Sequence, residues 1–131
     1  MFQTGSESGA IMEKVQGIGG MFFRAKDPDA LRKWYDQTLG VSDFMKKPWV
    51  QEQGETVFSP FNEDTDYFDR PSQQWMINFR VANLERMVAQ LTSLGIEVRQ
   101  DPEWDGEYGK FARIHDPEGN PIELWEPPEA S

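Results

Sequence analysis

The chain of 131 residues contains no cysteine and a single histidine, His115. Without cysteine it has no disulfide, no thiolate nucleophile and no sulfur ligand for zinc. No stretch approaches the ~20 consecutive apolar residues that a membrane-spanning helix needs. Residues 1–10 also lack the basic start and the apolar run of a secretory signal peptide. We therefore expect a cytoplasmic protein.

Positive charge is also scarce, because 13 Lys and Arg residues stand against 23 Asp and Glu residues and give a net charge of −10. Such a balance opposes binding to phosphate backbones and to anionic membrane surfaces. We therefore expect neither nucleic acid nor a membrane as a partner. The charge favours solubility and does not identify a ligand.

The remaining composition is that of one folded domain, with 37% hydrophobic and 13% aromatic residues. A chain of this length can bury a sizeable core. Residues 1–14 begin with a stretch rich in Gly, Ser and Thr, and we expect them to form a disordered N-terminal extension. The domain itself is predicted to span residues 15–127.

The first half of the domain contains one strong helix signal. Asp27 and Pro28 form an N-cap and first-turn pair, apolar residues then recur on one helical face, and Gly40 follows as a stop. Strands are predicted on both sides of this helix, at residues 15–26, 41–45, 49–53 and 56–61. Residues 62–74 are acidic, rich in turn formers and without apolar periodicity, which is typical of a linker.

The second half repeats the first. A strand is predicted at residues 75–81, a helix capped by Asn83 and stopped by Gly95 follows, then a strand at 96–99 and a closing hairpin. Phe23-Arg24 recurs as Phe79-Arg80 at a spacing of 56 residues. An internal repeat of this kind predicts two tandem βαβββ modules, residues 15–61 and 75–127. The expected fold is α+β, with the modules forming a curved, barrel-like mixed sheet and the helices on its outside.

The closing hairpin carries the most unusual strand. Its turn is Asp116–Asn120, in which every residue is a turn former. In the strand that follows, Ile122 and Leu124 lie on one face, whereas Glu123 and Trp125 lie on the other. A carboxylate in the middle of an apolar strand has two explanations. Either Glu123 lies on a solvated face, or it points into a pocket.

Three stretches resemble the vicinal oxygen chelate superfamily, which includes glyoxalase I, extradiol dioxygenases, fosfomycin-resistance enzymes and bleomycin-binding proteins. They are Phe22–Gly40, Ile77–Glu85 and Asp116–Glu126, and the last, D-P-E-G-N-P-I-E-L-W-E, is close to the family signature D-P-[DE]-G-N-x-I-E-L. The resemblance covers roughly residues 15–127. It implies the same tandem-module fold as the repeat.

In metal-using members, four strand positions converge on one divalent ion, and the resemblance maps them onto Gly20, Phe58, Met76 and Glu123. Glycine has no side chain to offer, phenylalanine has no lone pair, and a thioether is a soft ligand. One carboxylate does not make a tight divalent site, because catalytic sites use three or more protein ligands. We therefore predict a metal-free protein without a cofactor, and for His115 a surface or turn role.

Strand alternation predicts which side chains line a cup between the modules. Arg113 and Glu123 lie at matching depth on neighbouring strands, and the resemblance to fosfomycin-resistance enzymes places the Arg113 position in the pocket. Either the two close into a bidentate pair that fills the former metal site, or Arg113 helps to hold an anionic or carbonyl group of a ligand. The ligand-binding set predicted for the second case is Phe22, Trp49, Phe58, Met76, Asn78, Arg80, Phe111, Arg113, Glu123 and Trp125.

Three functions follow as hypotheses. The first is a small-molecule-binding protein of the bleomycin-resistance type, a homodimer whose ligand lies in an aromatic-lined cup. The second is a glyoxalase- or dioxygenase-like enzyme, which would use Glu123 as a general base or as a lone metal ligand. The third is a diverged member with an unknown metabolite. The sequence contains no feature that identifies the ligand.

Overall fold

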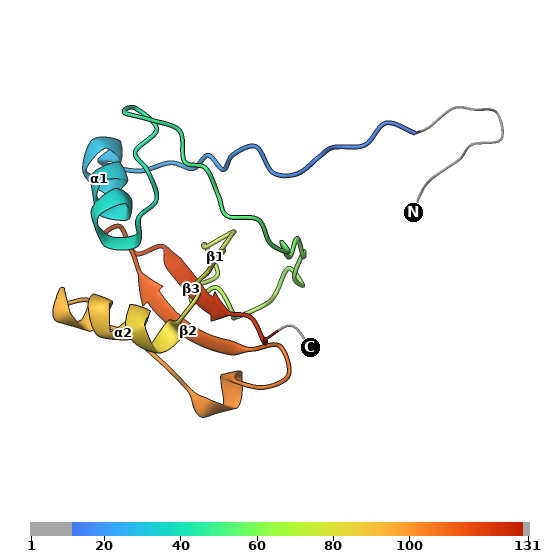
Figure 1. Cartoon of the computed structure of the whole chain (residues 1–131), viewed down its shortest axis with the longest axis vertical. Helices are drawn as coiled ribbons and strands as arrows, with labels where there is room; N and C mark the ends of the chain where they lie inside the picture. The colour runs from blue at the N-terminus through green and yellow to red at the C-terminus, as the bar shows by residue number, and fades with distance from the viewer. Residues whose placement is uncertain (1–11, 130–131) are drawn as a thin grey trace.

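The computed structural model describes residues 12–129, and Figure 1 shows the whole chain. The helices are α1 (Pro28–Leu39), α2 (Leu84–Ser93) and the short 3-10 helix η1 (Pro102–Trp104), and the strands are β1 (Ile77–Arg80), β2 (Lys110–His115) and β3 (Pro121–Glu126). The expected extension at residues 1–14 falls almost wholly outside this range. Within the described residues, no helix has the length and apolar character required to cross a membrane.

Both predicted helices form, and each begins where its capping residue predicts. The Asp27 side chain accepts a hydrogen bond from the Ala30 N–H at 3.1 Å, and Asn83 accepts one from Arg86 N–H at 2.9 Å. Such caps satisfy backbone donors that a helix N-terminus otherwise leaves free. Gly40 ends α1 with a φ of 75°, a left-handed conformation that glycine adopts without steric cost.

The sheet has three strands in the order β1–β3–β2, with β3 in the centre. β3 runs parallel to β1 and antiparallel to β2. Ile122 and Leu124 of β3 are fully buried against helix α2 and the neighbouring strand β2. Burial of each such side chain stabilises the fold by about 1.5–3 kcal/mol. The core consists of these two residues with Leu31, Tyr35, Leu84, Leu91, Ala112 and Ile114.

The turn between β2 and β3 is fixed by carboxylates that reach into the first half of the chain. Asp116 accepts hydrogen bonds from the Tyr35 hydroxyl of α1 at 2.8 Å and from the turn residues Glu118 and Asn120. Glu118 in turn accepts from the backbone N–H groups of Lys26 and Asp27 at 2.7 and 2.9 Å. The hairpin and the entry to α1 are therefore held together directly.

The strands predicted for the first module are not present. Residues 15–26, 49–53 and 56–61 contain no regular secondary structure, and the predicted strand 41–45 runs into a turn at its end. Strand formation needs a hydrogen-bonded neighbour, and these segments pair with no other described residues. In the second half, the predicted strand 96–99 is reduced to one pairing, Arg99 with Arg113. The sheet is therefore open and not barrel-like, and the predicted arrangement of two tandem βαβββ modules is not established.

The segments that lack strand partners also leave their apolar side chains in solvent. In Figure 1, the chain from residue 12 runs as an extended trace toward α1, and its end is packed on the fold, where the Phe23 ring contacts Tyr35 and Trp75. Val15 is 87% exposed, Phe22 95% and Phe58 86%. In residues 12–61, thirteen large apolar side chains are exposed, against two in the rest of the described chain. An apolar surface of this extent is typical of an interface or a ligand site.

Candidate functional site

The candidate site lies on the sheet face that turns away from the buried core. On this face Asn78 of β1 stands beside Glu123 of β3, which stands opposite Arg113 of β2. These three residues form one row across the sheet, which we call the polar row. The predicted alternation is thus confirmed for β3, because Ile122 and Leu124 are buried whereas Glu123 and Trp125 are partly exposed.

A second row of side chains runs beside the first. Arg80, Trp125 and Phe111 are neighbours on the three strands. The Phe111 and Trp125 rings lie nearly parallel, with 6.4 Å between their centroids and 9° between their planes. The Trp125 indole N–H donates to the Tyr108 carbonyl at 2.7 Å, and this bond fixes the ring. The face therefore places an ordered aromatic surface next to the polar row.

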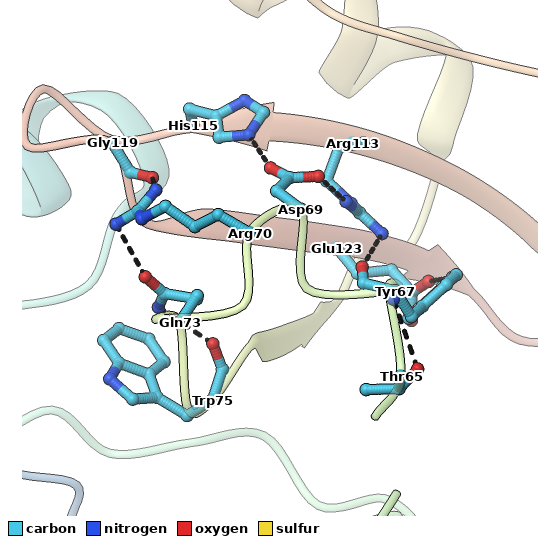
Figure 2. Close-up of polar contacts among 10 residues, drawn as sticks. All are labelled: Thr65, Tyr67, Asp69, Arg70, Gln73, Trp75, Arg113, His115, Gly119 and Glu123. Atoms are coloured by element: carbon cyan, nitrogen blue, oxygen red, sulfur yellow. Dashed lines mark hydrogen bonds and ion pairs between the residues drawn. The ribbon is translucent and has the colours of Figure 1, made fainter. Parts of the chain in front are cut away.

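Residues 65–73 lie against Arg113 and Glu123 of the polar row, and we call them the closing segment (Figure 2). Tyr67 donates its phenol hydrogen to Glu123, and its carbonyl accepts from Arg113 Nη2 at 3.1 Å. Asp69 accepts from Arg113 Nη1 at 2.9 Å and contacts the His115 ring with its other oxygen. Both charged residues of the polar row are therefore held by this segment.

Arg113 is only 6% exposed, so its charge must find partners inside the protein. Asp69 is that partner, although Glu123 lies directly across the strand pair. Glu123 instead accepts from Tyr67 and, at 2.8 Å, from Asn78 Nδ2. The bidentate Arg113–Glu123 pair considered from the sequence therefore does not form, because the closing segment supplies a separate partner for each group.

The closing segment is itself anchored to the hairpin. Arg70 donates to the Gly119 carbonyl at 3.0 Å and to Gln73 Oε1 at 2.7 Å. Gln73 is buried and donates to the Trp75 carbonyl at 2.9 Å. Asp69 is the only described non-glycine residue with a positive φ, 80°. Its backbone is therefore held in a left-handed conformation that most side chains disfavour.

Two pKa values in the site are shifted. Burial alone would raise the pKa of Asp69, but the hydrogen bond with His115 and the charges of Arg113, His115 and Arg99 outweigh burial and lower it below the ordinary 3.8. Burial, together with the hydrogen bond to Glu123 and its charge, raises the pKa of Tyr67 to about 12 against the opposing charge of Arg113. At neutral pH Tyr67 is therefore a hydrogen-bond donor, and Asp69 is an anion.

Asn78, Arg113 and Glu123 are predicted from the sequence to share one face of the sheet, and the structure places them in one row. The contacts of the closing segment are not predicted from the sequence. Residues 62–74 were interpreted as a linker because they lack apolar periodicity. One signal was available: Tyr67 and Phe68 form an aromatic pair inside an acidic stretch. Arg113 was a second signal, because a buried guanidinium needs an anion. The role predicted for His115 was a surface or turn position, and its partner in the structure is Asp69.

Several predicted site residues lie away from the polar row. Phe22 and Phe58 project into solvent, and Trp49 is 41% exposed with its ring 6.1 Å from that of Phe79. A Cβ placed on Gly20 would meet only the Phe22 ring. Met76 lies next to β1 and is half-buried. The predicted apolar walls at Phe22 and Phe58 are therefore not assembled around Glu123 within this single chain.

The metal-ligand positions implied by the family do not fit a metal here. Gly20, Phe58 and Met76 offer no hard donor, and the oxygens of Glu123 accept hydrogen bonds from Tyr67 and Asn78. Across residues 12–129, no three His, Asp or Glu side chains lie close enough to hold an ion. We therefore derive no chemistry that passes through a metal.

Substitutions at Asp69 and Glu123 separate their two roles. Asp69→Ala leaves the buried Arg113 without its anion and is expected to lower the free energy of unfolding by about 3 kcal/mol, the lower end for a broken buried pair, because Asp69 is 26% exposed. Glu123→Gln keeps an acceptor for Tyr67 and is expected to cost less than about 1.5 kcal/mol. Urea unfolding measures both. Asp66→Ala, an exposed control in the same segment, is expected to change stability by less than about 0.5 kcal/mol.

The lowered pKa of Asp69 predicts a pH-dependent stability. Because the folded protein holds this carboxyl below its ordinary pKa, the ionised group stabilises the fold. Its contribution is complete well above pH 3.8 and is lost as the pH falls through the folded pKa. The difference in unfolding free energy between the parent and Asp69→Asn should therefore shrink on acidification below that value. A difference that stays constant into strong acid would contradict the proposed role.

Comparison with known proteins places this geometry in a family. The family model described as a glyoxalase-like domain matches residues 20–125. No curated protein is significantly similar to the chain. Among solved structures, TnmS3, an antibiotic binding protein from Streptomyces sp. CB03234, is 19% identical and aligns with a TM-score of 0.59 over 89% of this chain and 100% of its own. At that identity the likeness concerns the fold alone.

Two other solved structures align less well. A glyoxalase/bleomycin resistance protein from the same Streptomyces strain is 21% identical, with a TM-score of 0.48 over 77% of this chain and 92% of its own. A glyoxalase family protein from Enterococcus faecalis is 35% identical over 39% of this chain and 40% of its own, with a TM-score of 0.33. The family model matches most of the chain, so the chain belongs to the glyoxalase-like domain family, within the vicinal oxygen chelate superfamily.

Proposed function

We propose that this protein binds a small molecule, without a metal, on the face of the sheet that carries the polar row. The observation that carries the proposal is the buried guanidinium of Arg113 beside the stacked rings of Phe111 and Trp125. An apolar or aromatic surface with a few fixed polar anchors is the usual form of a small-molecule site. The description of TnmS3 as an antibiotic binding protein supports ligand binding as the function of this fold.

We further propose that the protein is a homodimer in which the exposed segments of the first half are covered. Phe22 and Phe58, predicted as walls of the cup, are more than four-fifths exposed in the single chain. A second copy that buries residues 12–26 and 41–61 would remove this apolar surface from water. It would also supply the enclosure that the open, three-stranded sheet lacks.

Binding can be tested with 1-anilinonaphthalene-8-sulfonate, an aromatic anion whose fluorescence rises in an apolar environment. Titration is expected to show saturable binding that Trp125→Ala weakens by about tenfold or more. Stacking of a planar ligand ring on one aromatic side chain contributes ~1–3 kcal/mol to the binding free energy. Trp104→Ala, a matched change on η1 outside both rows, should leave the affinity unchanged. Equal losses in both variants would place the dye elsewhere and count against the proposal.

The enzyme alternative is distinguished by metal and turnover measurements. A metal-free binding protein should contain no stoichiometric divalent ion, and Zn²⁺, Ni²⁺, Mn²⁺ or Fe²⁺ should not raise its melting temperature. It should also leave hemithioacetals and catechols unchanged. About one metal ion per chain, with stability lost on chelation, would favour the alternative in which Glu123 acts as a base or a ligand.

The dimer is tested by mass in solution. Light scattering at tens of micromolar is expected to give twice the chain mass of 15.2 kDa. Replacing Phe22 by Ser should shift the protein toward the monomer, because the exposed ring is expected to lie in the interface. Tyr108→Ser removes a ring that is 71% exposed in the second half, and serves as the control. A parent protein that stays monomeric throughout this range would remove the proposal.

A further inference from the structure

The closing segment places a phenol and a carboxylate, two groups that a ligand could carry, against the charged residues of the polar row. Its Tyr67 supplies an aromatic ring with a hydroxyl that hydrogen-bonds Glu123, and its Asp69 supplies a carboxylate to Arg113 (Figure 2). The Tyr67 ring has two close neighbours. Arg113 Cζ lies 4.8 Å from its centroid, and Phe61 stacks at 5.7 Å with 14° between the planes. The face therefore already accepts a flat phenol and an anion at neighbouring positions.

The match between the closing segment and Arg113 is incomplete. Nη1 and Nη2 have partners in the segment, but Arg113 Nε is buried and has no hydrogen-bond partner among the described residues. A buried donor without a partner costs free energy. A free carboxylate could instead bind side-on to Nε and one Nη, in the bidentate geometry that guanidinium groups favour. Such a ligand anion would give Arg113 Nε the partner that the closing segment does not supply.

The closing segment also has features of a displaceable element. Pro71 and Ser72 at its turn are exposed, and Asp69 adopts a left-handed conformation at φ 80°. Removing the segment would take the anion from Arg113 and the phenol donor from Glu123. A molecule that replaces the segment must therefore bring both groups with it.

We infer that the ligand of this face is an aromatic phenol that also carries a carboxylate, and that it binds by taking the positions of Tyr67 and Asp69. This inference rests on the proposed function and names the ligand class for the same site. The closing segment then acts as an internal substitute that fills the site when no ligand is bound. The ligand and the segment compete, so removing the segment's own groups should raise affinity.

The competition can be measured with 4-hydroxybenzoate as the probe. Benzoate lacks the phenol, and 4-hydroxybenzamide lacks the carboxylate. The variant Tyr67→Ala/Asp69→Gly removes both internal groups, and glycine at position 69 tolerates the left-handed backbone. Calorimetry should show 4-hydroxybenzoate binding this variant about tenfold or more tightly than the parent, because no internal group competes. Asp64→Gly, a change at an exposed acidic residue before the closing segment, should leave the parent affinity unaltered.

The selectivity of the cleared variant tests the ligand class. Its melting temperature should rise more with 4-hydroxybenzoate than with either partial probe, and adding Arg113→Gln should abolish that rise. Equal effects of the three probes would overturn the inference. If the dye binds in a Trp125-dependent manner but 4-hydroxybenzoate does not bind, the ligand class is wrong and the proposed function stands. If neither binds, both fail.

A measurement on the unmodified chain covers the case in which the variant does not fold. Amide hydrogen exchange in the closing segment should become faster when 4-hydroxybenzoate is bound, because displaced backbone loses its protection. Exchange at Leu91, in the core, should not become faster, because ligand binding stabilises the folded state. Unchanged or slower exchange in the closing segment with the probe bound would overturn the inference.

Discussion

The site depends on the need of the buried Arg113 guanidinium for a counterion. Its position is set by the sheet, because β2 holds it opposite Glu123 while the neighbouring Ala112 and Ile114 are packed in the core. Removing such a charge from water costs several kcal/mol, and only a close anion with good hydrogen bonds offsets that cost. Asp69 supplies the anion from a segment that is neither helix nor strand, so a residue outside the sheet meets the electrostatic requirement of a residue within it.

The second half of the fold was readable from sequence because local signals and burial agree there. Asn83 caps α2, Gly95 follows it, and the alternation in β3 separates the buried Ile122 and Leu124 from Glu123. Strands are also predicted in the first half, but no strand forms within residues 12–61. A strand pattern predicts which side chains would be buried in a sheet. It does not show that a neighbouring strand is present to form the hydrogen bonds that a sheet requires.

The contacts of the site also fall into those that the sequence predicts and those that it does not. Pairing of Arg113 with Glu123 across the hairpin followed from counting residues on both sides of the turn, and the structure has that register. The contacts of Tyr67 with Glu123 and of Asp69 with Arg113 could not be derived by counting, because they join residues 56 and 44 positions apart in the sequence. The predicted roles of Phe22, Phe58 and Trp49 remain predictions, since their environment depends on surfaces outside the single chain.

The hydrogen bond between Tyr35 and Asp116 ties the geometry of the site to a helix that contributes no residue to it. Asp116 fixes the turn that aligns β2 with β3, and Tyr35 reaches it from α1 with its ring packed in the core. Changes in the exposed segments around α1 would leave this contact in place, whereas loss of the tyrosine hydroxyl would remove it. A fragment beginning after residue 61 would carry the whole polar row without the contact that aligns its hairpin.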